Sequence, residues 1–347
     1  MTARATCTRK LYSQRGEMPT YLALTRTAQE DLAAVQTYIS KQGDGWQDIH
    51  RVLPRVAKTF TQYSERYIEP GRLLLKASDR KFAQAMYGLY DSKAGYLRYK
   101  NAPRKPGYVG CCPYCGIKGS ITVDHYLPRS RKEFPHFSVL SANLVPACGD
   151  CQGHKLTYYA PTTGRVVRNR RRQMVAAKLS QRSYRFRTSD RRILHPYFDR
   201  FLSERILIAH IEMGARGVPS LVSITPRLSL ARSTRRAIEF HLDRLHVLER
   251  AKGEVEHLHS SILKGMKGVR TLAELLESLE KQLGSAQSRG GSLNFFDALY
   301  LRALIVRKDL HPQLLSVVET ENAVLVRVSQ ARRVRVPAHH GRRQPAR

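Results

Sequence analysis

Two C-x-x-C pairs, Cys112 with Cys115 and Cys148 with Cys151, constrain the fold of this chain more than any other feature. No hydrophobic secretory signal stands at the N-terminus, so these cysteines are expected to stay reduced in the cytoplasm and to bind metal. Each pair can form a knuckle, and two knuckles supply the four thiolates of a tetrahedral structural zinc site. Cys111 is an alternative to Cys112, although C-P-Y-C has the better knuckle spacing.

The segment between the two pairs is long enough to hold structure of its own. The stretch "ITVDHYLPRS" (residues 121–130) predicts a short strand that delivers Asp124 and His125. The stretch "FSVLSANLVPAC" (residues 137–148) predicts a return strand or loop that carries Asn143. A helix is expected to begin around the second cysteine pair. The sequence therefore predicts a strand–strand–helix unit whose ends are joined by zinc.

This block resembles the HNH endonucleases of the zinc-stapled ββα-metal type. The shared pattern is C-x-x-C, then D-H-x-x-P-x-S, then N-L-x-x-x-C-x-x-C and a lysine. Its positions in this chain are Cys112, Cys115, Asp124, His125, Pro128, Ser130, Asn143, Leu144, Cys148, Cys151 and Lys155. The resemblance implies metal-dependent hydrolysis of phosphodiester bonds, most readily those of DNA. The sequence around this pattern, including "HPYFD" (residues 195–199), is similar to that of HNH nucleases of bacterial anti-phage systems.

His125 is the natural general base of such a site, because an imidazole can take up a proton near neutral pH. Asn143 could accept a hydrogen bond from the other ring nitrogen and orient the base, which is also the role that the resemblance gives it. The resemblance makes Asp124 a ligand of a catalytic Mg²⁺ or Mn²⁺, ions that prefer oxygen ligands. Neighbouring residues of a strand point to opposite faces, so this role requires the strand to end there.

Gln152 stands where the family has Asn or His, and it is the main departure from the pattern. On a helix that starts near Cys148, Gln152 and Lys155 share one face, whereas His154 points elsewhere. We therefore expect Gln152 to be the second ligand of the catalytic metal, with His154 as the substitute. Lys155 is expected to contact a substrate phosphate; a solvated surface lysine is the alternative.

The charge of the chain predicts a polyanionic partner. Lys and Arg number 60 against 28 Asp and Glu, which gives a net charge of +32. Nucleic acid is the first candidate, DNA before RNA, and a ribosomal-type or merely soluble basic protein is the alternative. No apolar run is long enough to span a membrane, so no membrane partner is expected. The arginines of "RNRRR", namely Arg168, Arg170, Arg171 and Arg172, predict a strip that contacts phosphates, or else a solvated linker.

The regions on both sides of the nuclease block are predicted to be mainly helical, which makes the fold class α+β. We expect four parts: a basic helical N-terminal region (1–107), the nuclease domain (108–160), a basic linker, β-hairpin and helical C-terminal region (161–330), and an arginine-rich tail (331–347) that stays disordered until it meets a polyanion.

Several elements are predicted within the flanking regions. Capping boxes are expected at Thr27 with Glu30 and at Thr271 with Glu274. The remaining expectations are helices over about 78–99, from about 233 through 262, over 272–283 and over 293–306, the last of them amphipathic, a hairpin of 206–212 with 218–224, and a flexible linker over 284–292.

Two other functions remain open at this point. One is a catalytically inactive zinc-dependent module that only binds nucleic acid. The other is a nuclease subunit that acts with a partner protein such as an ATPase, which would require exposed apolar faces on the C-terminal helices. His195, Tyr197 and Asp199 of "HPYFD" are interpreted as structural packing.

Overall fold

The computed structural model describes residues 22–41, 47–73, 80–104, 109–129, 133–159, 190–214, 218–290 and 292–320. Its helices are α1 (Ala28–Ser40), α2 (Gln47–Arg66), α3 (Arg80–Leu89), α4 (Gly149–Lys155), α6 (Arg232–Arg244), α7 (Val247–Lys264), α8 (Leu272–Gly290) and α9 (Phe296–Val306). Its strands are β1 (Ile121–His125), β2 (Leu144–Cys148), β3 (Leu207–Met213) and β4 (Pro219–Pro226). The described chain is thus mainly helical with two small two-stranded sheets, which is the α+β class that the sequence predicts.

Helix α1 begins where the sequence predicts, at the capping box. The amide of Glu30 donates to the Thr27 hydroxyl at 3.2 Å, and the Thr27 amide donates to the Glu30 carboxylate at 2.6 Å. The helix expected over 78–99 is shorter than predicted, since α3 ends at Leu89. The buried Lys100 ammonium donates to the Leu89 carbonyl. A side chain therefore provides the hydrogen bond that a further helical turn would otherwise give to this carbonyl. A 3₁₀-helical stretch, Gly95–Arg104, follows.

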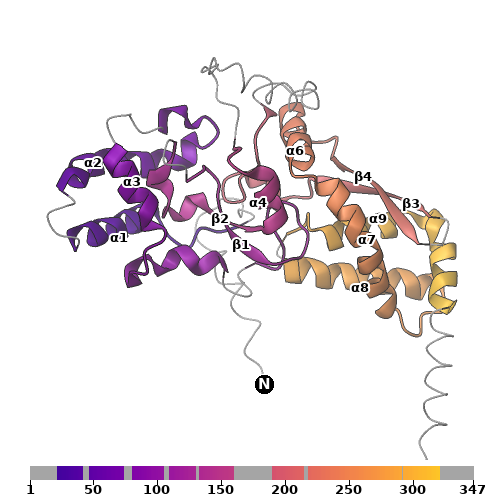
Figure 1. Ribbon diagram of the computed structural model, residues 1–347. Helices are drawn as coiled ribbons and strands as arrows, with labels where there is room; N and C mark the ends of the chain where they lie inside the picture. Colours follow the sequence, from indigo (N-terminus) through magenta and orange to yellow (C-terminus); the bar gives the residue numbers. More distant parts are fainter. Residues whose placement is uncertain are drawn as a thin grey trace, which may run out of the picture.

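Strands β1 and β2 and helix α4 form the predicted strand–strand–helix unit. The strands are antiparallel, with Ile121 opposite Cys148 and His125 opposite Leu144. Helix α4 follows β2 directly, with Cys148 at its N-cap. Figure 1 shows this unit between the N-terminal helices α1–α3 on one side and the elements from α6 to α9 on the other. Every residue of β2 is buried.

The C-terminal region contains the predicted hairpin and three departures from the predicted helices. Strands β3 and β4 pair in antiparallel fashion, with an irregularity between His210 and Ile211. The long helix expected from about residue 233 is two helices, which meet at His246 in a left-handed conformation (φ 51°). Helix α8 continues to Gly290 through the stretch expected to be a linker, because Ala286 is buried in the core. Helix α9 is buried on nearly all sides and is not amphipathic.

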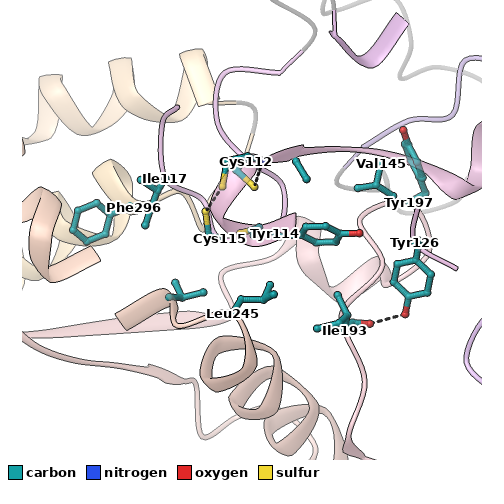
Figure 2. Packing of buried hydrophobic residues seen from close by; sticks show 14 of the residues in the cluster. Cys112, Tyr114, Cys115, Ile117, Tyr126, Val145, Ile193, Tyr197, Leu245 and Phe296 are labelled. Carbon is teal, nitrogen blue, oxygen red and sulfur yellow. Dashed lines mark hydrogen bonds between the residues drawn. The ribbon is translucent and has the colours of Figure 1, made fainter. Parts of the chain in front are cut away.

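One continuous hydrophobic core runs through all three regions. It contains Val35 and Phe60 from the N-terminal helices, Val145 from β2 and Tyr300 from α9. Figure 2 shows how its members from distant parts of the sequence come together around the first cysteine pair. The domain boundaries predicted at 107 and 160, and the tail from 331 onward, lie outside the described residues. None of the described helices is both long and apolar enough to span a lipid bilayer.

Candidate active site and metal centre

The first cysteine pair lies on a tight turn. The Gly116 amide donates to the Cys112 carbonyl at 2.8 Å, and the Cys112 amide donates to the Ile117 carbonyl at 3.0 Å. Gly116 adopts φ 72°, a conformation that favours glycine, and a Cβ there would lie 3.0 Å from the Asn294 carbonyl oxygen. The turn therefore directs both thiols to one side and rests against the N-terminus of α9 (Figure 2).

The second pair completes a buried cluster of four thiols. Cys148 ends β2 and Cys151 lies in the first turn of α4, and the Sγ atoms of the two pairs all lie within 4.8 Å of one another. A tetrahedral zinc ion with Zn–S bonds of about 2.3 Å requires S–S distances of about 3.8 Å. The four cysteines therefore fit a structural zinc ion, and Cys112 completes the cluster in preference to Cys111.

Arg250 of α7 donates two hydrogen bonds into this cluster. Its Nη1 lies 3.1 Å from the Cys151 sulfur and its Nη2 lies 3.2 Å from the Cys148 sulfur. The same guanidinium pairs with Asp150 at 3.1 Å. Four thiolates around one Zn²⁺ leave a net charge of −2, which two charge-assisted N–H···S bonds would partly neutralise. Sequence reasoning missed this residue, because no signal in the sequence joins Arg250 to a cysteine about a hundred positions away.

Asp124 and Lys155 form a buried ion pair on the side of β1 that faces α4. The Lys155 ammonium lies 2.9 Å from Asp124 Oδ2, and the Lys155 side chain is fully buried. The ammonium also donates to the His125 carbonyl at 3.0 Å, and the Tyr114 hydroxyl donates to the same Asp124 oxygen at 2.9 Å. The Lys155 ammonium is therefore bonded inside the protein in this structure, and its contact with a substrate phosphate stays a prediction.

His125 points to the opposite face from Asp124, as alternation along a strand requires. Its Nε2 lies 3.0 Å from the carbonyl oxygen of Ser138. A carbonyl can only accept, so Nε2 carries the proton and Nδ1 keeps a free lone pair. The half-buried ring also meets the Tyr90 ring edge-on, at 4.6 Å between centroids. Burial lowers the pKa of His125 to about 4, so the imidazole is neutral at physiological pH.

Asn143 does not bind the imidazole, which corrects the predicted role. Its Oδ1 accepts from the Leu127 amide and from the Tyr63 hydroxyl, each at 2.7 Å. Its Nδ2 donates to the carbonyls of Leu127 at 3.0 Å and Phe137 at 3.2 Å. The backbone carbonyl of Ser138 takes the expected place beside His125. Asn143 acts on that carbonyl indirectly, because it fixes the loop that leads from β1 to Ser138.

Gln152 and His154 point in different directions from α4. The Gln152 amide donates to the hydroxyl of Thr122, which lies two positions before Asp124 on the same face of β1. The His154 ring instead faces the His246 ring at 4.5 Å between centroids, at the junction of α6 and α7. The expected geometry is therefore present, since Gln152 and Lys155 share the face toward β1 and His154 does not.

The oxygen ligands proposed for a catalytic divalent ion do not fit one as they are placed. Asp124 Oδ2 already accepts from an ammonium and a hydroxyl, and the ammonium would repel a cation bound to the same oxygen. Among the described residues, Asp124 belongs to no group of three or more acidic, imidazole or thiol ligands.

The "HPYFD" segment packs behind the site, as expected. His195 is fully buried among aromatic rings and lies 3.4 Å from the Tyr63 hydroxyl. The Tyr197 hydroxyl donates to the Leu144 carbonyl at 2.9 Å, and Asp199 binds Arg192 with two bonds of 2.6 Å. Tyr63 therefore joins the "HPYFD" segment to Asn143 and the loop that holds His125. The predicted phosphate contacts Arg168, Arg170, Arg171 and Arg172 lie outside the described residues.

Comparison with known proteins gives one partial match. No protein-family model matches the chain, and no solved structure matches it. Among curated proteins, protein ea31 of Escherichia phage lambda is 31% identical over 110 residues, which is 29% of this chain. The match covers 34% of ea31, so the chain spans about a third of that relative's length.

Proposed function

We propose that this chain is an endonuclease of the HNH type, which hydrolyses phosphodiester bonds in nucleic acid with His125 as the general base. The observation that carries the proposal is the hydrogen bond between His125 Nε2 and the Ser138 carbonyl. This bond leaves Nδ1 as the basic atom, and the neutral ring can take a proton from an attacking water molecule. The low pKa makes His125 a weak base, but the imidazole is unprotonated near pH 7 and can therefore accept a proton.

Two further observations support the proposal. The ββα unit with its buried thiols provides the zinc-stapled scaffold that the sequence resemblance implies. The net charge of +32 favours a polyanionic substrate. DNA is proposed as the substrate in preference to RNA. A role in bacterial phage defence is proposed only on the resemblance of the amino-acid sequence.

A second function is favoured by the Asp124–Lys155 ion pair. A carboxylate that is already neutralised is a poor ligand for a divalent ion, so the unit could serve as a zinc-held module that binds nucleic acid without cleaving it. Such a module would bind with a steep dependence on salt and yield no product. The partner-dependent nuclease has less support, because the apolar stripes of α7 and α8, with Val255 and Leu279 among them, are buried in the core.

The deciding experiment is nicking of supercoiled plasmid by the purified full chain. We expect wild type to nick, and His125→Ala to be at least about a hundredfold slower. His257→Ala is the matched control, since His257 is an exposed histidine on α7. Reactions with Mg²⁺, with Mn²⁺ and with neither would measure the dependence on divalent ions, with the zinc content of each sample determined in parallel. Tight, salt-sensitive binding without nicking would establish the binding module instead.

A further inference from the structure

Two tyrosines at the C-terminal end of α3 hold the guanidinium of Arg129 beside His125. The Arg129 Cζ lies 4.3 Å from the Tyr87 ring centroid and 4.8 Å from the Tyr90 ring centroid. The Tyr90 ring is the one that meets the His125 imidazole edge-on, at 4.6 Å and an interplanar angle of 71°. The expected base and this cation are therefore packed on the same aromatic ring.

The hydrogen bonds of Arg129 leave one edge of its guanidinium open. Nη1 donates to the Tyr87 carbonyl at 3.3 Å and to the two carboxylate oxygens of Asp91 at 3.2 and 3.3 Å. Nε and Nη2 make no hydrogen bond within the part of the chain that the structure describes. These two groups form the fork that binds two oxygens of a carboxylate or phosphate at once. The stacking and the Nη1 bonds fix the plane of the group while that fork stays unused.

Arg129 is also accessible, unlike Lys155 and Lys100, the other cations near His125 among the described residues. Its side chain is 20% exposed, and its partner Asp91 is 65% exposed. Lys155 is fully buried on Asp124, and Lys100, whose ammonium lies 5.6 Å from the Tyr90 ring centroid, is buried on backbone carbonyls. An exposed ion pair such as that of Arg129 with Asp91 is weak, so a substrate phosphate could compete with Asp91.

We propose that Arg129 is the phosphate-anchoring residue of the site. Its Nε/Nη2 edge binds the non-bridging oxygens of the phosphodiester whose hydrolysis His125 catalyses as general base. This assignment rests on the phosphodiester substrate proposed above. It gives Arg129 the role that the sequence suggested for Lys155, and it makes α3 of the N-terminal region one wall of the substrate site. Tyr87 and Tyr90 act as positioning residues that hold the guanidinium.

The test measures binding separately from cleavage. In the His125→Ala background, binding of a fluorescein-labelled DNA duplex is followed by anisotropy over a series of salt concentrations. We expect Arg129→Gln to weaken binding about tenfold and to reduce the slope of log K against log salt by about one. Arg98→Gln removes the same charge from an exposed position of the neighbouring 3₁₀ segment, outside the Tyr87–Tyr90–Arg129 contacts, and is the matched control. Arg129→Lys keeps the charge but loses the fork, so the slope should stay while affinity falls.

The outcomes distinguish this assignment from the proposed function. If Arg129→Gln and Arg98→Gln have the same affinity and salt slope, the anchoring role is overturned, whether or not wild type cleaves. If Arg129→Gln alone weakens binding, the anchor stands, and with His125 intact the same change should slow nicking. Plasmid nicking by wild type against His125→Ala reports independently on the nuclease itself. Thermal unfolding of each variant shows that a loss of binding is not a loss of fold.

Discussion

The ammonium of Lys155 lies 2.9 Å from a carboxylate oxygen of Asp124, in a position where the lysine side chain has no exposure to solvent. This contact joins the last turn of α4 to β1 across the face that the sequence suggested for catalysis. A buried ion pair of this kind holds the two elements in register, and each charge depends on the other for compensation.

Loss of one partner of this pair should destabilise the protein strongly. We expect Lys155→Met to lower the free energy of unfolding by about 3–5 kcal/mol, because it leaves the Asp124 carboxylate buried without a counter-charge. The double variant Asp124→Asn/Lys155→Met should recover most of that loss. Urea denaturation of the two variants and wild type measures both effects. A cost below about 1 kcal/mol for Lys155→Met would show that Asp124 has another cation available.

Gln152 and His154 should differ in their effect on nicking. Gln152 faces β1 beside Thr122, on the same face as Asp124, whereas His154 faces His246. We expect Gln152→Ala to slow nicking indirectly, because loss of its bond to Thr122 loosens β1, the strand that carries His125, and His154→Ala to leave the rate close to wild type. Initial rates on supercoiled plasmid at equal zinc content measure the difference. The reverse order of effects would place the substrate on the α6–α7 side of α4.

Arg250 should control how firmly zinc is held. Removal of its two N–H···S bonds in Arg250→Gln is expected to weaken zinc affinity by about 10–100-fold, because groups that hydrogen-bond to metal ligands usually contribute this much. Lys252→Gln, which removes an exposed charge from the same helix, is the control. Zinc release to a chromogenic chelator gives the rate without any assay of activity. Equal release from both variants would contradict this role for Arg250.

The stability of the protein should fall as the pH drops below about 6.5. His241 is buried, where its Nδ1 accepts from the Leu194 amide at 3.0 Å and its Nε2 donates to the Tyr114 carbonyl at 2.7 Å. Burial lowers the pKa of His241 to about 4 from an ordinary value of 6.5. The unfolded state therefore binds a proton more readily than the folded state. The contribution of His241 to stability is fully present above pH 6.5 and is lost as the pH falls toward 4.

The expected contribution of His241 to this loss is about 3 kcal/mol. Urea denaturation at a series of pH values gives the slope, and His241→Asn should flatten it relative to wild type. The comparison at each pH separates this residue from acid release of zinc, which affects both proteins. An unchanged slope in the variant would mean that His241 does not titrate in this range.

Tyr63 should act on the site through structure alone. Its hydroxyl donates to Asn143 Oδ1 at 2.7 Å, from a position that is almost fully buried. We expect Tyr63→Phe to cost about 1–2 kcal/mol of stability, since Asn143 loses one of its partners and the ring packing stays. Thermal unfolding measures the cost. A lower nicking rate at a temperature where the variant is still fully folded would show that the Asn143 loop positions His125.

Local chemistry was predicted well from the sequence. The capping box of Thr27 with Glu30 forms as expected, and that of Thr271 with Glu274 forms with bonds of 3.1 and 3.2 Å. The two cysteine pairs, the strand–strand–helix order and the β3–β4 hairpin also follow the prediction. Each depends on residues close in sequence or on a metal-ligand spacing, so the pattern alone carries the information.

Helix boundaries were predicted less well where packing competes with local preference. No glycine or proline marks the break at His246, which the sequence therefore did not reveal; there the ring packs on His154 of α4. The glycines of 284–292 suggested a linker, but burial of Ala286 keeps residues 284–290 in α8. In both places contacts between distant segments outweigh a weak local signal.

The sequence by itself determined which residues are chemically able to act: four thiols spaced for zinc, an imidazole at the end of a strand, and an excess of positive charge. Only the tertiary structure decided how they are used. It placed Lys155 on Asp124, Ser138 beside His125, and Arg250 on the thiols. The reason is that burial removes water from these groups, so each must find a partner inside the protein, and most of those partners come from segments that the sequence spacing does not connect.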